Sequence, residues 1–562
     1  MRPTSPAATL ERLLGDPWDA ANPVGFAAVL DADELGEPLA AGERLLDDAG
    51  LNAEFVPASL GGWLTTLDRL IQIGRSVFRR DPSLGLSYGM SSFIAAVNVW
   101  TSGRDEQQRE LADLLLANQK VAIAFHELAH GNDFTRNDFR ARPDGAGRLL
   151  LTGRKELIAN VERASALVIL ARTADTRSGP AQSQLLVPRD GLDPARTRFL
   201  PRFSTVGMRG VPLGGVELTD CPVPEDAFVG VPGRAPAVAM RAFQVTRTVL
   251  PAMAAGSLDT ALRTVLTFAG SRVLRGAPAA EMPYVRQILA EVFLDLLICD
   301  CVSTTAAHAI HLLPAETSVH AAAVKYFVPT RLSRAMHRLS QVLGAQFYLR
   351  DGRYGILQKL VRDLPPAVFG HAAPEVCLAT ILPQLPRVAR SWSDPAPPPD
   401  GLFTLGADLP PIEFGRLLPT STSDTVGAAM LATEVPAGDG PPPWLAEVFV
   451  AELRELRREI LALPVSDLSL RASATALTLP RRYTTVLAAV SCLNVWLRNR
   501  ASGQGFLADP AWVTAALSRL AGELGQGPSQ VAGPLAEALY AELLDRRDTN
   551  VSFDLYATPL GL

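Results

Sequence analysis

The pattern of apolar residues changes twice along the chain, and these changes limit the folds that it can adopt. Up to about residue 120, apolar residues recur at the i, i+3, i+4 spacing of amphipathic helices. From about residue 121 the chain contains short runs such as VAIAF and SALVILART, separated by Gly, Asp, Pro and Asn, which predict strands of a small antiparallel sheet or barrel. Residues 236–345 return to helical periodicity in three long segments, which predicts a helix bundle.

Two proline clusters, DPAPPPDG at 394–401 and GDGPPPW at 438–444, interrupt the later helical pattern. Such clusters favour stiff, extended connectors, and further helical segments follow the second one. A chain of 562 residues is also too long for a single core. The sequence therefore predicts a mostly α-helical fold with a central β domain, in this order: an N-terminal helical domain (1–120), a β-barrel domain (121–235), a helix-bundle domain (236–392), a proline-rich linker region (393–443) and an extra C-terminal helical domain (444–562).

The charge balance excludes some classes of function. Lys and Arg number 53 against 58 Asp and Glu, so the formal net charge is -5, and basic residues alternate with acidic ones. This pattern does not predict binding to nucleic acid or to an anionic membrane. No apolar run is long enough to span a bilayer, the first residues lack an apolar signal core, and the five cysteines lack a disulfide framework spacing. We therefore expect a cytoplasmic protein with no nucleic-acid partner and no membrane span.

The segment HELAH at 126–130 matches HExxH, the zinc motif of many peptidases. In those enzymes two histidines one helical turn apart bind zinc, and the glutamate polarises the bound water. Here the preceding VAIAF run predicts a strand, and GND at 131–133 would end a helix at the second histidine. Glu156 or Glu162 would have to serve as the third ligand. We therefore expect no metal, and a zinc peptidase is the least favoured function.

Several segments resemble, in the same order, motifs of the acyl-CoA dehydrogenase family. LNAEFVPASLGG is similar to the family's vPxxyGG turn, and HELAHGND stands where the flavin loop TEPxxGSD is usual. LTGRKELIAN resembles LNGxKxWITN, and VGMRGVPLGGVELTDCPVPEDAFVG resembles the strand motif that leads into the bundle. QVLG at 341–344 and KLVRD at 359–363 resemble QxxGGxGy and KxxRD. The resemblance extends from residue 45 to about 375.

The resemblance implies an N-terminal helical domain, a β-barrel and a four-helix bundle, with FAD between barrel and bundle. The adenosine half of FAD is usually held by a neighbouring subunit, and members with an additional helical domain are often dimers. We therefore expect a homo-oligomer, with a dimer favoured. The substrate of such enzymes is an acyl thioester, carried here by coenzyme A or an acyl carrier protein. A carboxylate removes the α-proton while the β-hydrogen leaves as hydride to the flavin.

Residue by residue, the resemblance places eight positions at FAD: His126, Asn132, Leu157, Ala159, Arg272, Gln341, Gly344 and Ala345. Several depart from the family pattern. His126 and Asn132 replace a threonine and a serine and still offer hydrogen bonds. Leu157 replaces a tryptophan and loses its stacking face, and Ala159 replaces a threonine without its hydroxyl. Ala345 replaces the second glycine of its motif.

The catalytic glutamate of the family is absent from the segment VFGHAAPE. Counting from Arg362-Asp363 without gaps places His371 there, and aligning Phe369 places Gly370; the second position used in the family is Thr246. An imidazole exchanges protons near neutral pH, so His371 is the candidate base. The first hypothesis is an FAD-dependent oxidoreductase that desaturates an acyl thioester. The alternatives are a redox-inactive or non-redox member of the same fold, for binding, assembly or another acyl transformation, and a flavin-dependent monooxygenase.

Overall fold

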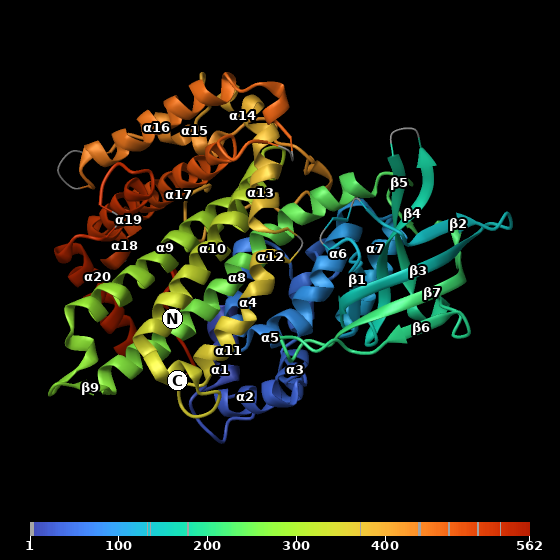
Figure 1. Ribbon diagram of the computed structural model, residues 1–562, viewed down its shortest axis with the longest axis horizontal. Coiled ribbons are helices and arrows are strands. Elements are labelled where there is room, and N and C mark those ends of the chain that lie inside the picture. The colour runs from blue at the N-terminus through green and yellow to red at the C-terminus, as the bar shows by residue number, and fades with distance from the viewer. Residues whose placement is uncertain are drawn as a thin grey trace.

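The computed structural model places one sheet at the side of a large helical body (Figure 1). The two ends of the chain meet within this body, since Gly561 contacts the backbone of Glu11. The structure describes residues 5–131, 133–134, 136–176, 179–370, 372–435, 440–469, 472–502, 505–528 and 530–561.

The N-terminal segment folds into helices, as its periodicity predicts. These helices are α1 (Pro6–Leu14), α2 (Phe26–Leu35), α3 (Ala40–Asp48), α4 (Leu67–Arg80), α5 (Pro82–Gly85), α6 (Ser91–Ser102) and α7 (Asp105–Leu116). Capping residues set their starts: the Ser5 side chain accepts a hydrogen bond from the Ala8 amide, and Asp81 accepts one from the Ser83 amide. Helix α4 is buried along most of its length, so it forms part of the core rather than a surface layer.

The eight strands between the helical parts form one sheet. They are β1 (Lys120–Ala124), β2 (Arg140–Pro143), β3 (Arg148–Ala159), β4 (Ala164–Thr176), β5 (Gly179–Pro188), β6 (Thr197–Leu200), β7 (Leu213–Pro224) and β8 (Phe228–Val229). The order is β6-β7-β3-β2-β4-β5-β8, and β1 pairs with β4. Most pairs are antiparallel, as predicted, but β1 and β2 run parallel to β4. The sheet has its own hydrophobic core, and α6 and α7 contact β1, so this strand joins the sheet to the helical body.

Three long helices form the bundle: α8 (Ala235–Ser271), α9 (Pro283–Leu312) and α10 (Thr317–Leu343). They begin where the sequence returns to helical periodicity. A series of short helices follows: α11 (Ile356–Asp363), α12 (Pro365–Phe369), α13 (Pro374–Ile381) and α14 (Leu385–Ser391). Helices α11 and α12 contact both α8 and α10, α13 contacts α10, and α14 contacts α16 (Pro443–Leu461). Prolines at the first helical position start α12 and α13, where the missing N–H costs no hydrogen bond. The side of the bundle opposite α9 is therefore segmented rather than one continuous helix.

The proline-rich region does not remain extended throughout. Between the proline clusters lies α15 (Thr425–Ala432), and Leu402, Phe403 and Leu417 are buried. The Asp424 side chain joins this region to three other elements: it accepts hydrogen bonds from Nε2 of His320 at 2.8 Å, Nε1 of Trp392 at 3.0 Å and the Tyr483 hydroxyl at 2.9 Å. The segment is thus packed against the bundle, which its proline content alone does not predict.

The C-terminal helices lie against α9 and α10 and share their hydrophobic core. They are α16 (Pro443–Leu461), α17 (Thr478–Asn499), α18 (Gly505–Ala508), α19 (Pro510–Glu523) and α20 (Gly533–Asp548). After α20 the chain returns to the N-terminal helices, where Asp554 pairs with Arg79 at 3.3 Å and with Arg75 at 3.7 Å. Both arginines belong to α4, so ion pairs join the segment after α20 to the N-terminal helices.

These observations confirm the predicted fold class, mostly helical with a central β domain. All five cysteines are buried and free, so no disulfide contributes to the fold. Among the described helices, none combines the length and the apolar character needed to cross a bilayer. The exact domain boundaries and the cytoplasmic location remain predictions.

Candidate functional site

Strand β1 leads directly into the loop predicted to contact FAD. The backbone oxygen of His126 accepts a hydrogen bond from the Glu156 amide at 3.0 Å, which holds the loop beside β3. The imidazole is partly buried, and its Nδ1 is buried without a hydrogen-bond partner among the described residues. Burial lowers the pKa of His126, because it penalises the charged ring. The Glu156 backbone and carboxylate oppose this shift, so the imidazole lies against the end of β3.

A buried ion pair fixes the rest of this loop. The Lys155 ammonium on β3 lies 2.7 Å from Oε1 of Glu127 and 3.0 Å from Oδ1 of Asn137. The Glu127 carboxylate also accepts the backbone amides of Asp138 at 3.0 Å and Phe139 at 3.1 Å. Burial lowers the pKa of Lys155 to about 8, although the Glu127 carboxylate opposes this shift. Glu127 and Lys155, both retained from the family motifs, thus anchor the two ends of the loop to one strand.

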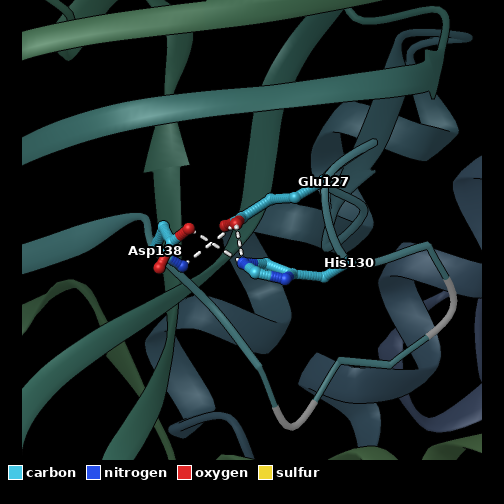
Figure 2. Close-up of side chains that lie close together, drawn as sticks. All are labelled: Glu127, His130 and Asp138. Carbon is cyan, nitrogen blue, oxygen red and sulfur yellow. Dashed lines mark hydrogen bonds and ion pairs between the residues drawn. The ribbon is translucent and has the colours of Figure 1, made fainter.

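The contacts of Glu127 and His130 bear on the hypothesis of a zinc peptidase site. Figure 2 shows Glu127, His130 and Asp138 pointing toward one another, with Nε2 of His130 2.8 Å from Asp138 and 3.7 Å from Glu127. His126 is not part of this cluster, because residues 126–130 form an extended segment and a turn instead of a helix. The Lys155 ammonium already neutralises Glu127. The arrangement lacks the two-histidine helical face of a zinc peptidase, as the preceding strand and the following glycine predict.

The end of β3 carries Leu157 and Ala159 on one face. Both are partly exposed, while Ile158 and Asn160 between and after them are buried. Leu157 has φ of 55° at a β-bulge, which turns this face relative to the rest of the strand. The Asn160 amide nitrogen donates to the Ser87 backbone oxygen at 2.7 Å, so the strand end is fastened to the N-terminal helices. Leu157, Ala159 and the His126 loop therefore lie at one site on the sheet.

The other four described positions lie at the far end of the bundle. Arg272 follows the last residue of α8 and is exposed; Gln341 and Ala345 are exposed around the end of α10, and Gly344 has φ of 59°. Phe243, which contacts the sheet side, precedes Arg272 by 29 residues on α8, or about 43 Å at 1.5 Å per residue. Within one chain the structure therefore separates the predicted cofactor residues into two groups. Asn132 lies outside the described residues.

Three phenylalanine rings meet where the sheet faces the bundle. The Phe243 ring on α8 lies 6.5 Å from the Phe125 ring, next to His126, and 5.6 Å from the Phe134 ring, measured between centroids. Such edge-on contacts are a favourable geometry for aromatic pairs. They form an apolar wall between the His126 loop and the interior of the bundle.

The region expected to hold the catalytic base contains one carboxylate among its described residues, and it is exposed. Thr246 is buried and donates to the Phe243 backbone oxygen at 3.5 Å. Gly370 ends α12, Glu375 is exposed at the start of α13, and His371 lies outside the described residues. The role of His371 as base remains a prediction.

Instead, the structure brings two basic residues into this region: Arg247, which the resemblance identifies as the typical arginine of the bundle helix, and Lys325, which sequence reasoning missed. Arg247 on α8 and Lys325 on α10 are only 5% and 2% exposed. The Lys325 ammonium donates to the Ala367 backbone oxygen of α12 at 2.6 Å, and the Arg247 guanidinium lies 5.3 Å from the centre of the Phe243 ring. The signal in the sequence is one basic residue within each apolar helical stretch, FQVTRTVL and AAAVKYFV.

Comparison with known proteins places this arrangement among flavoenzymes and their relatives. The profile "Acyl-CoA dehydrogenase, C-terminal domain" matches residues 236–383. The human mitochondrial short-chain specific acyl-CoA dehydrogenase is 28% identical over 273 residues, 48% of this chain and 65% of that enzyme, so the match covers less than two thirds of its length. The 3-sulfinopropanoyl-CoA desulfinase of Advenella mimigardefordensis is 26% identical over 57% of this chain and 79% of its own length. The structure of a Bacillus anthracis acyl-CoA dehydrogenase complexed with FAD has a TM-score of 0.70, with 16% identity, over 96% of this chain and 87% of that one.

Proposed function

Because the chain belongs to the acyl-CoA dehydrogenase family, we propose that it is an FAD-binding protein that acts on an acyl thioester. The Nδ1 of His126, buried beside Leu157 and Ala159 without a hydrogen-bond partner among the described residues, is the observation that carries this proposal, because a polar cofactor atom would satisfy it. The simplest reaction is α,β-desaturation. The bound flavin would supply the hydride acceptor, and the carrier of the acyl group would be coenzyme A or an acyl carrier protein.

The residues present fit such a cofactor. Gly131 in the His126 loop and Gly344 after α10 have positive φ, and a Cβ at either would meet no atom within 4 Å, so both backbones are open to a ligand. His126, Asn132, Leu157 and Ala159 would hold the flavin half. Arg272, Gln341, Gly344 and Ala345 would hold the adenosine half.

A second copy of the chain would complete the site. Arg272 is about 43 Å along α8 from the aromatic wall, which exceeds the reach of one dinucleotide. The exposed ends of α8 and α10 would therefore serve the cofactor of a partner subunit. This argument supports a homodimer.

The chain's own residues support binding more strongly than oxidation. Lys155 and Glu127 position the loop, Phe243 separates the flavin side from the bundle, and no described carboxylate stands ready to take the α-proton. One alternative is therefore a redox-inactive or non-redox member of the fold. The desulfinase among its relatives illustrates another transformation of an acyl thioester. A flavin-dependent monooxygenase is the further alternative.

The visible absorption spectrum of the purified protein tests the proposal. We expect a flavin band, acquired at the latest on reconstitution with FAD, and loss of flavin on gel filtration of the Arg272→Ala variant. Arg498→Ala, which removes another exposed arginine, is the control and should retain flavin. A colourless protein that takes up no FAD would refute the proposal.

Anaerobic titration with acyl thioesters then separates the reactions. Rapid bleaching of the flavin band indicates desaturation, and no bleaching with any thioester favours the non-redox alternative. Substrate-dependent oxygen consumption with an external reductant indicates a monooxygenase.

A further inference from the structure

Arg247 and Lys325 form a buried cation pair that no described carboxylate neutralises. The Arg247 Nε is buried without a hydrogen-bond partner, and the Ala367 backbone oxygen is the one partner that the described residues offer to the Lys325 ammonium. The described residues thus offer the two cations one hydrogen bond in total, the one from Lys325 to the Ala367 backbone oxygen.

Other buried lysines of this protein do have anionic partners. The Lys359 ammonium, 1% exposed at its side chain, lies within 2.5 Å of both Asp81 and Asp363. Lys155 lies 2.7 Å from Glu127. Lys359 and Lys155 thus pair with carboxylates, and the buried Arg80 donates instead to the Val24 and Gly15 backbone oxygens. Arg247 and Lys325 have fewer partners than these cations, and this difference needs an explanation.

The exposed Glu375 carboxylate acts on the neighbouring Cys377 thiol, but neither cation forms an ion pair with a described carboxylate. Burial lowers the pKa of Lys325 to about 8, the Cys377 thiol opposes this shift, and the positive charge of Arg247 adds to it. Burial raises the pKa of Cys377, so this group stays a neutral thiol. The remaining contacts, the Phe243 ring and the Ala367 backbone, are uncharged. An anionic ligand would supply the negative charge that the described contacts lack.

We propose that Arg247 and Lys325 bind a carboxylate, or a similar singly charged oxyanion, at the end of the acyl group of the substrate. The position favours an acyl group, because Phe243 joins the pair to the His126 loop and Ala367 lies on the segment where the family places its base. The inference rests on the proposed function, since it takes the ligand to be an acyl thioester.

Two thioesters of equal chain length test this proposal. Glutaryl-pantetheine and valeryl-pantetheine differ in a terminal carboxylate against a methyl group, and the pantetheine arm is common to coenzyme A and carrier proteins. With the wild-type protein in isothermal titration calorimetry, we expect the glutaryl compound to bind at least about tenfold more tightly. Equal affinity, or no binding of either compound, overturns the proposal, and this comparison depends on no variant.

Variants locate the effect. Lys325→Met should reduce the preference to about threefold or less without weakening valeryl binding. Its ligand-free melting temperature should equal or exceed that of the wild type, because removal of an unpaired buried charge relieves a penalty. Lys359→Met is the matched control: it should lower the melting temperature, because it leaves Asp81 and Asp363 unpaired. A Lys325→Met protein that keeps the full preference would contradict the assignment. The titration measures no flavin signal, so a colourless protein that still prefers the glutaryl compound would count against the proposed function alone.

Discussion

Replacement of Lys155 by methionine gives the most direct test of how the His126 loop is held. The change removes three contacts of the ammonium: Glu127 at 2.7 Å, Asn137 at 3.0 Å and the Phe125 backbone oxygen at 3.3 Å. The Glu127 carboxylate, 6% exposed, then remains buried without its counter-charge. Breaking a buried ion pair on one side costs about 3–5 kcal/mol.

The Phe139 amide provides a local probe, because it donates to Glu127 at 3.1 Å. In native-state hydrogen exchange, we expect this amide to exchange about two to nearly four orders of magnitude faster in Lys155→Met, at 1.36 kcal/mol for each factor of ten. Flavin retention should fall together with its protection, because the same contacts position His126.

A double variant distinguishes the charge effect from a general packing defect. Lys155→Met with Glu127→Gln removes both charges and leaves one backbone N–H without an acceptor, which costs about 1–3 kcal/mol. The double variant should therefore protect Phe139 better than Lys155→Met alone. If the double variant is as destabilised as the sum of the two single variants, the ion pair does not hold the loop.

Three further predictions concern other parts of the chain. Asp424→Ala should lower the thermal midpoint strongly, and Asp424→Asn less so, because alanine leaves the Tyr483 hydroxyl and the Trp392 indole without their acceptor; an unchanged midpoint would contradict this role. Asp554→Ala should expose the C-terminal tail to a carboxypeptidase, since it removes the ion pairs that join the tail to Arg79 and Arg75, which keep other carboxylate partners; equal resistance to cleavage would show that other contacts hold the tail. The pKa of Lys325 is about 8 in the folded protein, where burial lowers it, and about 10.4 in the unfolded chain. Between these two values the unfolded chain binds more protons than the folded one, so the contribution of Lys325 to the free energy of unfolding rises with pH. Thermal midpoints at pH 8 and 9.5 should therefore rise less, or fall more, in Lys325→Met than in the wild type, and parallel profiles would exclude this titration.

The long helices and the strands were predictable because each carries its signal locally. Helices α8, α9 and α10 show helical periodicity over 27 to 37 residues, and β3 and β4 are separated by turn residues. Helix α15 carries no such signal: TVGAAMLA is apolar on every side, so its residues fit a buried strand or helix equally well. Its conformation is decided by tertiary contacts, chiefly those of Asp424 at its N-cap.

In the candidate site, too, some residues were predictable from a local motif and others only meet through tertiary packing. His126, Leu157 and Ala159 were predicted together because a motif places them, and the Glu156–His126 backbone hydrogen bond brings their segments side by side. Arg247 and Lys325 are 78 residues apart in sequence and meet only because α8 packs on α10. No local pattern specifies that contact, so a single sequence does not reveal it.

The sign of the charge in the bundle determines which reaction can start there. Removal of an α-proton needs a group that accepts a proton, and two buried cations beside it lower the basicity of any neighbour. The same two cations stabilise a negative charge that arrives with the substrate or develops on it. With the carboxylate gone and Arg247 and Lys325 in place, the bundle is better suited to bind an acid group and the charge that forms beside it than to abstract a proton from a neutral chain. A substrate with its own negative charge would therefore be complementary to this part of the bundle.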